Sequence, residues 1–324
     1  MHSMILAAFS GDSSTAVGMC SAGAALFLIG GWAAKSDIAE ARGLEKIVAL
    51  RNLCLAVPLA VFGALHLFGP QFVKNIVPAY MPGQMFWVYF VGCALIAASL
   101  SIATGIAVRW SGLLFGIMMF LFVGMLYLPS ALTHLHARIT WTIVFRESSF
   151  GGAGWIVAGT AMGTSRRQGE RILVTVGRIL VTVALIVFGI EHFLHSTGLP
   201  GVPLKKQLAT WIPGRSLIDY VTGAALLLAA GSSLLKKKAR TVASYAAAWL
   251  LLMILVIYLP VMITALSEPG IGVKVEGINY FADTLLFAGA ILALASAAPR
   301  SVAANPTTTE KTLSPAHSGA STRN

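Results

Sequence analysis

Nine long apolar runs divide this chain, and they constrain its fold more than any other feature of the sequence. Hydrophobic residues make up 57% of the 324 positions and charged residues only 11%. The mean hydropathy of +0.80 is far above that of water-soluble domains of this size. A bilayer core about 30 Å thick needs about 20 apolar residues per helix, and a helix satisfies its own backbone hydrogen bonds. We therefore predict an all-α polytopic membrane protein that contacts the lipid bilayer.

The predicted spans cover residues 14–34, 47–68, 84–108, 110–132, 149–165, 172–194, 216–235, 241–266 and 278–298. The fifth is glycine-rich and the shortest. Its glycines, such as Gly151, Gly152 and Gly154, suit close packing of helices within the chain or between chains.

The distribution of positive charge predicts the orientation of these spans. With this layout, 16 of the 23 Lys and Arg residues lie on one side of the membrane and 7 on the other. Cytoplasmic connections carry the excess of Lys and Arg, which predicts an external N-terminus and a cytoplasmic C-terminus. The net charge of +11 comes in short groups between apolar runs, so it indicates topology and no nucleic-acid partner.

An internal repeat is the second strong feature of the sequence. VFGALH, at residues 61–66, aligns with VFGIEH, at residues 187–192, at an offset of 126. After a connection five residues longer in the second copy, the offset becomes 131. From Pro82 to Pro129 we count 13 identities in 48 positions, among them a Pro-Gly pair, Arg109 with Arg240, and a Tyr-Leu-Pro motif.

The repeat predicts how the chain is divided. Residues 1–46 would contain an external N-terminus, an extra helix and a cytoplasmic connection. Residues 47–165 and 166–298 would be two four-helix units of the same orientation, because each has an even number of spans. Residues 299–324 are rich in Ser, Thr, Ala and Pro and are predicted to form a disordered cytoplasmic tail.

Two histidines at the repeated helix ends are the first candidate site residues. Gly63 and His66 lie three residues apart, as do Gly189 and His192, so each pair shares one helix face. A glycine permits close helix approach, so each histidine is predicted to point into the bundle. Such an imidazole can bind a ligand or take part in redox chemistry. It can also simply form a hydrogen bond to a neighbouring helix or loop.

The second copy adds two ionisable residues, Glu191 and His195. Ionisable side chains within spans are costly and mark candidate functional sites. We therefore assign His66, Glu191 and His192 as candidate catalytic residues and His195 as a candidate cofactor-binding residue. His192 and His195 would need a third ligand from another external connection, such as His66 or Glu147, to hold a metal, and no metal site is predicted.

Two aspartates, Asp219 and Asp283, also fall within predicted spans. They either pair with basic residues or lie near the interface, or they line a permeation pathway between the two units.

The external connections end in an aromatic residue followed by an apolar residue and a Pro-Gly turn. Tyr80 and Trp211 are these aromatic residues, and they serve either as interfacial anchors or as caps over the histidine at the preceding helix end. A quinone suits such a cap, with aromatic faces for stacking and an imidazole for its carbonyl. The proline of each Tyr-Leu-Pro motif is predicted to close its helix.

The VFGxxH helix ends, followed by the Pro-Gly turn and a helix rich in small residues, resemble the DoxX family of four-helix membrane proteins. Two fused units of this kind would cover residues 47–298. Members of that family resemble the membrane subunit of thiosulfate:quinone oxidoreductase, and others are linked to membrane redox complexes. The resemblance places family-like positions at Gly63, His66, Gly189 and His192, and it implies a quinone as cofactor and a redox partner subunit.

The leading functional hypothesis is a quinone-linked redox subunit of a bacterial-type plasma (inner) membrane, whose partner supplies the electron carrier. Its site would lie at the outer rim near His66, Glu191 and His192. The alternatives are a small-solute or ion permease and a scaffold that helps to assemble a membrane complex. No P-loop, dinucleotide-binding glycine motif, HExxH zinc motif or nucleophile elbow occurs, so the sequence does not favour ATP-driven or covalent nucleophilic chemistry.

Overall fold

The computed structural model describes residues 2–161, 168–208, 210 and 212–299, with side chains from Ser14 onward. All its regular elements are helical, and eight helices are long and apolar enough to cross a membrane. A ninth helix, α8, has the length of a span but carries three charged residues, Arg138, Arg146 and Glu147. The prediction of an all-α polytopic membrane protein with about nine spanning helices is confirmed.

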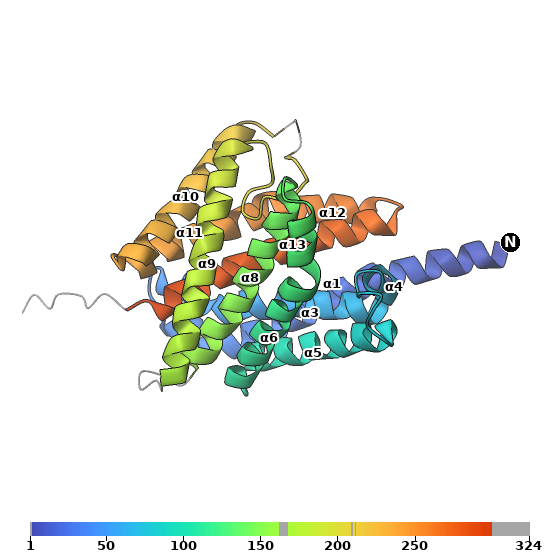
Figure 1. Cartoon of the computed structure of the whole chain (residues 1–324), viewed down its shortest axis with the longest axis horizontal. Coiled ribbons are helices and arrows are strands. Elements are labelled where there is room, and N and C mark those ends of the chain that lie inside the picture. The colour runs from blue at the N-terminus through green and yellow to red at the C-terminus, as the bar shows by residue number, and fades with distance from the viewer. Residues whose placement is uncertain (1, 162–167, 209, 211, 300–324) are drawn as a thin grey trace, which may run out of the picture.

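The first half of the chain begins with a long helix, α1, that extends beyond the other helices at its N-terminal end (Figure 1). Its elements are α1 (His2–Glu40), α2 (Glu45–Ala49), α3 (Arg51–Phe68), α4 (Pro70–Lys74), α5 (Gln84–Thr104), α6 (Val108–Phe122), the π-helix η1 (Val123–Tyr127), α7 (Leu128–Thr133) and α8 (Arg138–Thr160).

The second half begins with α9, the counterpart of α3, and from α10 on it repeats the order of the elements that follow α4. It comprises α9 (Gln168–Leu194), α10 (Arg215–Leu235), α11 (Ala239–Met253), the π-helix η2 (Ile254–Tyr258), α12 (Leu259–Ser267) and α13 (Ile271–Ala297). The bounds of α10, α11 and η2 are those of α5, α6 and η1 plus 131 at both ends. We call helices α3 to α8 the first unit and helices α9 to α13 the second unit. The predicted limits of the first unit, residues 47 and 165, stay a prediction. The predicted boundary between the units falls within residues 162–167, and the predicted tail, apart from Pro299, covers residues 300–324; both ranges lie outside the described part of the chain.

The backbone of the tight connections repeats with the same offset. Ala107, with φ +55°, corresponds to Lys238, with φ +50°, and each directly precedes a helix, α6 in the first unit and α11 in the second. A positive φ is uncommon for residues other than glycine. Its retention at equivalent positions indicates that the helix-to-helix geometry of these connections is common to both units.

The Tyr-Leu-Pro motifs do not close their helices, contrary to the expectation from the sequence. The spans continue through Pro129 and Pro260 to Thr133 and Ser267. A proline lacks the N–H and clashes with the carbonyl four residues earlier. In both units a π-helix that ends on the tyrosine of the motif widens the helix directly before the leucine and accommodates the proline.

The two units interlock through their last helices. Helix α8 packs along α9, and α13, which is buried along most of its length, packs along α3 (Figure 1). At the opposite ends of these helices from His66 and His192, Arg109 on α6 lies 3.5 Å from Glu170 on α9. Arg240 on α11 correspondingly pairs with Glu45 on α2 at 2.5 Å. The arginine matched in the repeat therefore ties the first unit to the start of α9, and the second unit to α2, directly before the first unit.

The glycines of α8 serve packing within the chain. Gly152 lies against the backbone of Gly177 on α9, where any added Cβ would meet the Gly177 carbonyl oxygen. Close approach of this kind is the means by which helices associate in lipid, where no hydrophobic driving force acts between them.

The two largest differences between predicted spans and observed helices are at the first residues of α8 and α1. Helix α8 begins at Arg138, eleven residues before the predicted start at residue 149, and α1 begins at His2 and not at residue 14. Arg146 and Glu147, expected in an external connection, therefore lie inside a helix. The start of α8 was predicted too late because Arg146 and Glu147 make this stretch look too polar for a span, although the two side chains are nearly buried as an ion pair.

Removing the Arg240 side chain is expected to weaken the interlock between the units. Arg240 donates hydrogen bonds to both Glu45 oxygens and to the Ala295 carbonyl. We expect Arg240→Met to lower the unfolding free energy in detergent by about 1–2 kcal/mol, because these charge-assisted bonds are lost together. Lys237→Met, which changes an exposed residue in the connection directly before α11, is the control. Equal stability of both variants would show that the pair adds nothing to the fold.

Candidate functional site

An apolar groove of about 460 Å³ lies beside the end of α3 in the first unit. Its walls come from the end of α3, the segment 73–81, α5 and the α6–η1 region, and they include Val73, Ile76, Val77, Pro78, Met81, Trp87, Val88, Phe90, Val91, Met118, Leu121 and Met125. Ile76, Phe90 and Leu121 are each more than half exposed. Because these residues belong to or flank apolar spans, the groove opens toward the lipid.

Two polar side chains stand at the inner end of the groove, His66 from α3 and Tyr127 from η1. With Phe122 they also line a second cavity, of about 240 Å³, that lies deeper between α3, α6, α8 and α13. The groove and the inner cavity are therefore neighbours that share one polar boundary.

A charged cluster of Arg146, Glu147 and Asp283 lines the inner cavity. The Arg146 guanidinium lies 2.7 Å from Asp283 Oδ2 on α13 and 2.5 Å from Glu147 Oε1 on its own helix. The three side chains are only 14%, 10% and 8% exposed, in the order Arg146, Asp283, Glu147. Asp283 thus pairs with a basic residue, one of the alternatives that the sequence left open. Two carboxylates share one guanidinium, which leaves one carboxylate without its own cation.

A third hollow connects this cluster with the surface. It also measures about 240 Å³, shares Asn279 and Asp283 with the inner cavity, and is bordered by the exposed residues Gly272 and Glu276. The groove, the inner cavity and this hollow therefore form a series from the lipid-facing side of α5 to the start of α13.

The glycines beside His66 hold it against α5, as the sequence predicts. A Cβ added to Gly92 would lie 2.9 Å from the His66 Cβ, and a Cβ added to Gly63 would lie 3.1 Å from the Gly92 carbonyl oxygen. The His66 Nδ1 atom lies 2.7 Å from the Phe62 carbonyl oxygen. Since that oxygen only accepts, Nδ1 carries the proton in the neutral ring and Nε2 is left as an acceptor.

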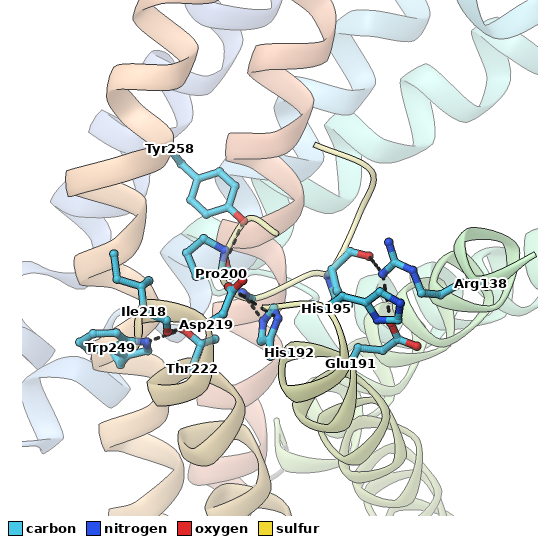
Figure 2. Close-up of polar contacts among 12 residues, drawn as sticks. Arg138, Glu191, His192, His195, Pro200, Ile218, Asp219, Thr222, Trp249 and Tyr258 are labelled. Atoms are coloured by element: carbon cyan, nitrogen blue, oxygen red, sulfur yellow. Dashed lines mark hydrogen bonds and ion pairs between the residues drawn. The ribbon is translucent and has the colours of Figure 1, made fainter. Parts of the chain in front are cut away.

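His192, the equivalent residue of the second unit, is fully buried. Its Nε2 accepts a hydrogen bond from the Gly201 N–H at 2.9 Å, and its Nδ1 lies 3.9 Å from Asp219 Oδ1 (Figure 2). Tyr258, the counterpart of Tyr127, donates to the Pro200 carbonyl at 2.7 Å. The connection between α9 and α10 thus fills the place that corresponds to the groove.

Glu191 and His195 point away from this arrangement and toward α8. Glu191 Oε2 lies 3.0 Å from Arg138 Nη1 and 3.2 Å from His195 Nδ1, as Figure 2 shows beside the His192 group. His195 is 51% exposed. These contacts describe an ion pair at the rim that fastens α9 to the start of α8.

No family model, curated protein or solved structure matches this chain.

Among the assigned residues that the structure describes, only His66 lines the groove. His66 and His192 do not share a site. His66 lines the groove and the inner cavity, whereas His192 contacts Gly201 and lies near Asp219. Tyr80 is 71% exposed and lies outside the groove, where Met81 and Trp87 form the wall instead. Trp211 lies outside the described residues. Within the described part of the chain, no three His, Cys, Asp or Glu side chains gather as metal ligands.

Sequence reasoning missed two members of the site, Tyr127 and Arg146. The signal for Tyr127 was present, because the Tyr-Leu-Pro motif recurs at the offset of 131, but it was interpreted as a helix end. Arg146 gave no such signal, because α13, the last helix of the second unit, contains no arginine.

Proposed function

We propose that the chain is the quinone-binding membrane subunit of a redox complex, and that its quinone site is the groove of the first unit. The observation that carries this proposal is a lipid-facing apolar groove that ends on an imidazole and a phenol. The same proposal includes membership of the DoxX family and location in a bacterial-type plasma membrane. It also includes a partner subunit that supplies the electron carrier.

The chemistry of the groove suits a quinone. A quinone combines a flat ring and an apolar tail with two carbonyl acceptors, and it reaches its site from the bilayer. The Tyr127 hydroxyl supplies a donor for a carbonyl, and the walls supply apolar and aromatic contacts from Trp87, Phe90 and Phe122. A volume of about 460 Å³ is within the range of small-molecule sites.

The charged cluster supports a role in moving protons. Reduction or oxidation of a quinone couples electrons to protons, and a proton released into lipid has no acceptor. Glu147 and Asp283 share the single guanidinium of Arg146, so this cluster has a carboxylate available to hold a proton. The surface hollow beside Asp283 gives the cluster an outlet to water.

The proposal is tested by equilibrium binding of a short-chain ubiquinone analogue to the purified protein in detergent. Met125→Trp fills the groove and is expected to abolish saturable binding. Tyr127→Phe removes one hydrogen bond to the ring and is expected to weaken binding about fivefold to tenfold. Met125 and Tyr127 both line the groove, whereas Tyr80 does not.

Tyr80→Ala is therefore the matched control, because it removes an exposed aromatic residue of the adjoining connection and should leave the affinity unchanged. Absence of binding to folded wild-type protein would remove the proposal. Loss of binding in the Tyr80 variant alone would place the ligand at the interfacial aromatic residue and not in the groove.

A further inference from the structure

The same histidine and tyrosine stand at one site in each unit, but only the second unit fills that site with its own chain. Tyr258 and His192 are bridged there by a single peptide group (Figure 2). Its carbonyl, from Pro200, accepts from the tyrosine hydroxyl at 2.7 Å, and its N–H, from Gly201, donates to His192 Nε2 at 2.9 Å.

The bridging peptide is held in place by the structure of its loop. Residues 199–203 are buried, and the base of the loop is closed by a hydrogen bond from the Leu208 N–H to the Thr197 carbonyl and by a bridge between Gly198 and Gln207. The corresponding connection of the first unit is five residues shorter and forms α4 instead. Across the described residues, no protein group is hydrogen-bonded to the Tyr127 hydroxyl or to His66 Nε2.

The hydrogen-bond roles of the two histidines agree. Phe62 fixes the proton of neutral His66 on Nδ1, so that Nε2 accepts. His192 Nε2 also accepts, because its partner is a backbone N–H. Each unit therefore presents one donor, the tyrosine hydroxyl, and one acceptor, the imidazole Nε2.

We infer that the Pro200–Gly201 peptide is a built-in counterpart of the ligand of the first unit, and that this ligand carries a hydrogen-bond donor as well as an acceptor. Resting on the proposed function, the inference is that the groove binds the reduced quinol in preference to the quinone. A quinol hydroxyl accepts from Tyr127 and donates to His66 Nε2. A quinone has acceptors only and leaves His66 Nε2 without a partner.

The inference is tested with the reduced and oxidised forms of one short-chain benzoquinone, bound anaerobically to the detergent-solubilised protein. The quinol is expected to bind about tenfold more tightly, because an acceptor left unsatisfied in an apolar site is costly. In His66→Leu this preference should disappear, mainly through weaker binding of the quinol. In Tyr127→Phe both forms should weaken by a similar factor, so that the preference is kept.

The outcomes separate the inference from the function on which it rests. Equal affinity of wild-type protein for the two forms, or tighter binding of the quinone, overturns the inference but leaves the quinone site intact. A preference that persists in His66→Leu also overturns it, because Nε2 is then not its source. Failure of both forms to bind overturns the proposed function itself.

Discussion

Replacing Arg146 with methionine is expected to cause one of the two largest losses of stability in this protein, about 3–5 kcal/mol of unfolding free energy. Arg146 is the partner of both Glu147 and Asp283, and all three side chains are nearly buried. Methionine has a similar length but no charge, so the variant leaves two carboxylates in a low-dielectric cavity without a cation. The midpoint of unfolding in mixed detergent micelles measures the loss.

The source of that loss can be isolated on the same helix. Arg138→Met also removes an arginine from an ion pair, with Glu191, but the Arg138 side chain is 31% exposed. A pair of this exposure contributes about 1 kcal/mol or less. Adding Glu147→Gln and Asp283→Asn to Arg146→Met should restore most of the stability, because the uncompensated charge is removed. Equal losses from the two arginine variants would show that water reaches the Arg146 cluster freely.

Gly201→Ala is expected to have the second large effect, a loss of about 2–4 kcal/mol. Gly201 has φ +113°, a backbone conformation that side chains other than glycine rarely adopt. An added Cβ would lie 3.2 Å from Thr284 Cγ2 and 3.3 Å from Leu250 Cδ2. Relief of these contacts would move the peptide away from His192 and break its hydrogen bond to the buried imidazole.

Gly214→Ala is the matched control for this variant. Gly214 lies in the same connection with φ +67°, and an added Cβ there would be no closer than 3.9 Å to its neighbours. The backbone cost alone, about 1 kcal/mol, should therefore apply. Thermal unfolding of the two variants in detergent tests the difference. A similar loss in both would mean that the loop tip is not packed tightly against α11 and α13.

The position of His66 shows what local sequence can predict about a site. The spacing of Gly63 and His66 places both on one helix face, and the structure puts that face against α5, with Gly92 directly beside the histidine. A three-residue spacing and the packing rule for small residues are enough for this inference, because both are properties of one helix.

The positions of Glu191 and His192 show what local sequence cannot predict about a site. The two residues are adjacent in sequence and both were assigned as catalytic. Glu191 faces Arg138 across the α8–α9 contact, whereas His192 faces a loop inserted from beyond the end of its own helix. Adjacent residues on a helix point about 100° apart, so each meets a different neighbour. The sequence does not specify those neighbours.

The sequence by itself determined the membrane class, the helical repeat and the pairs of matched landmarks, because hydropathy and spacing are local and survive in each helix independently. Only the tertiary structure decided that the two units differ at their equivalent sites. Five extra residues let one connection fold inward between His192 and Tyr258, while the shorter connection leaves a groove beside His66 and Tyr127. The ion cluster of Arg146, Glu147 and Asp283 likewise depends on α8 crossing α13. Loop insertion and helix crossing bring together residues far apart in the chain, so the packing of the whole molecule fixes them.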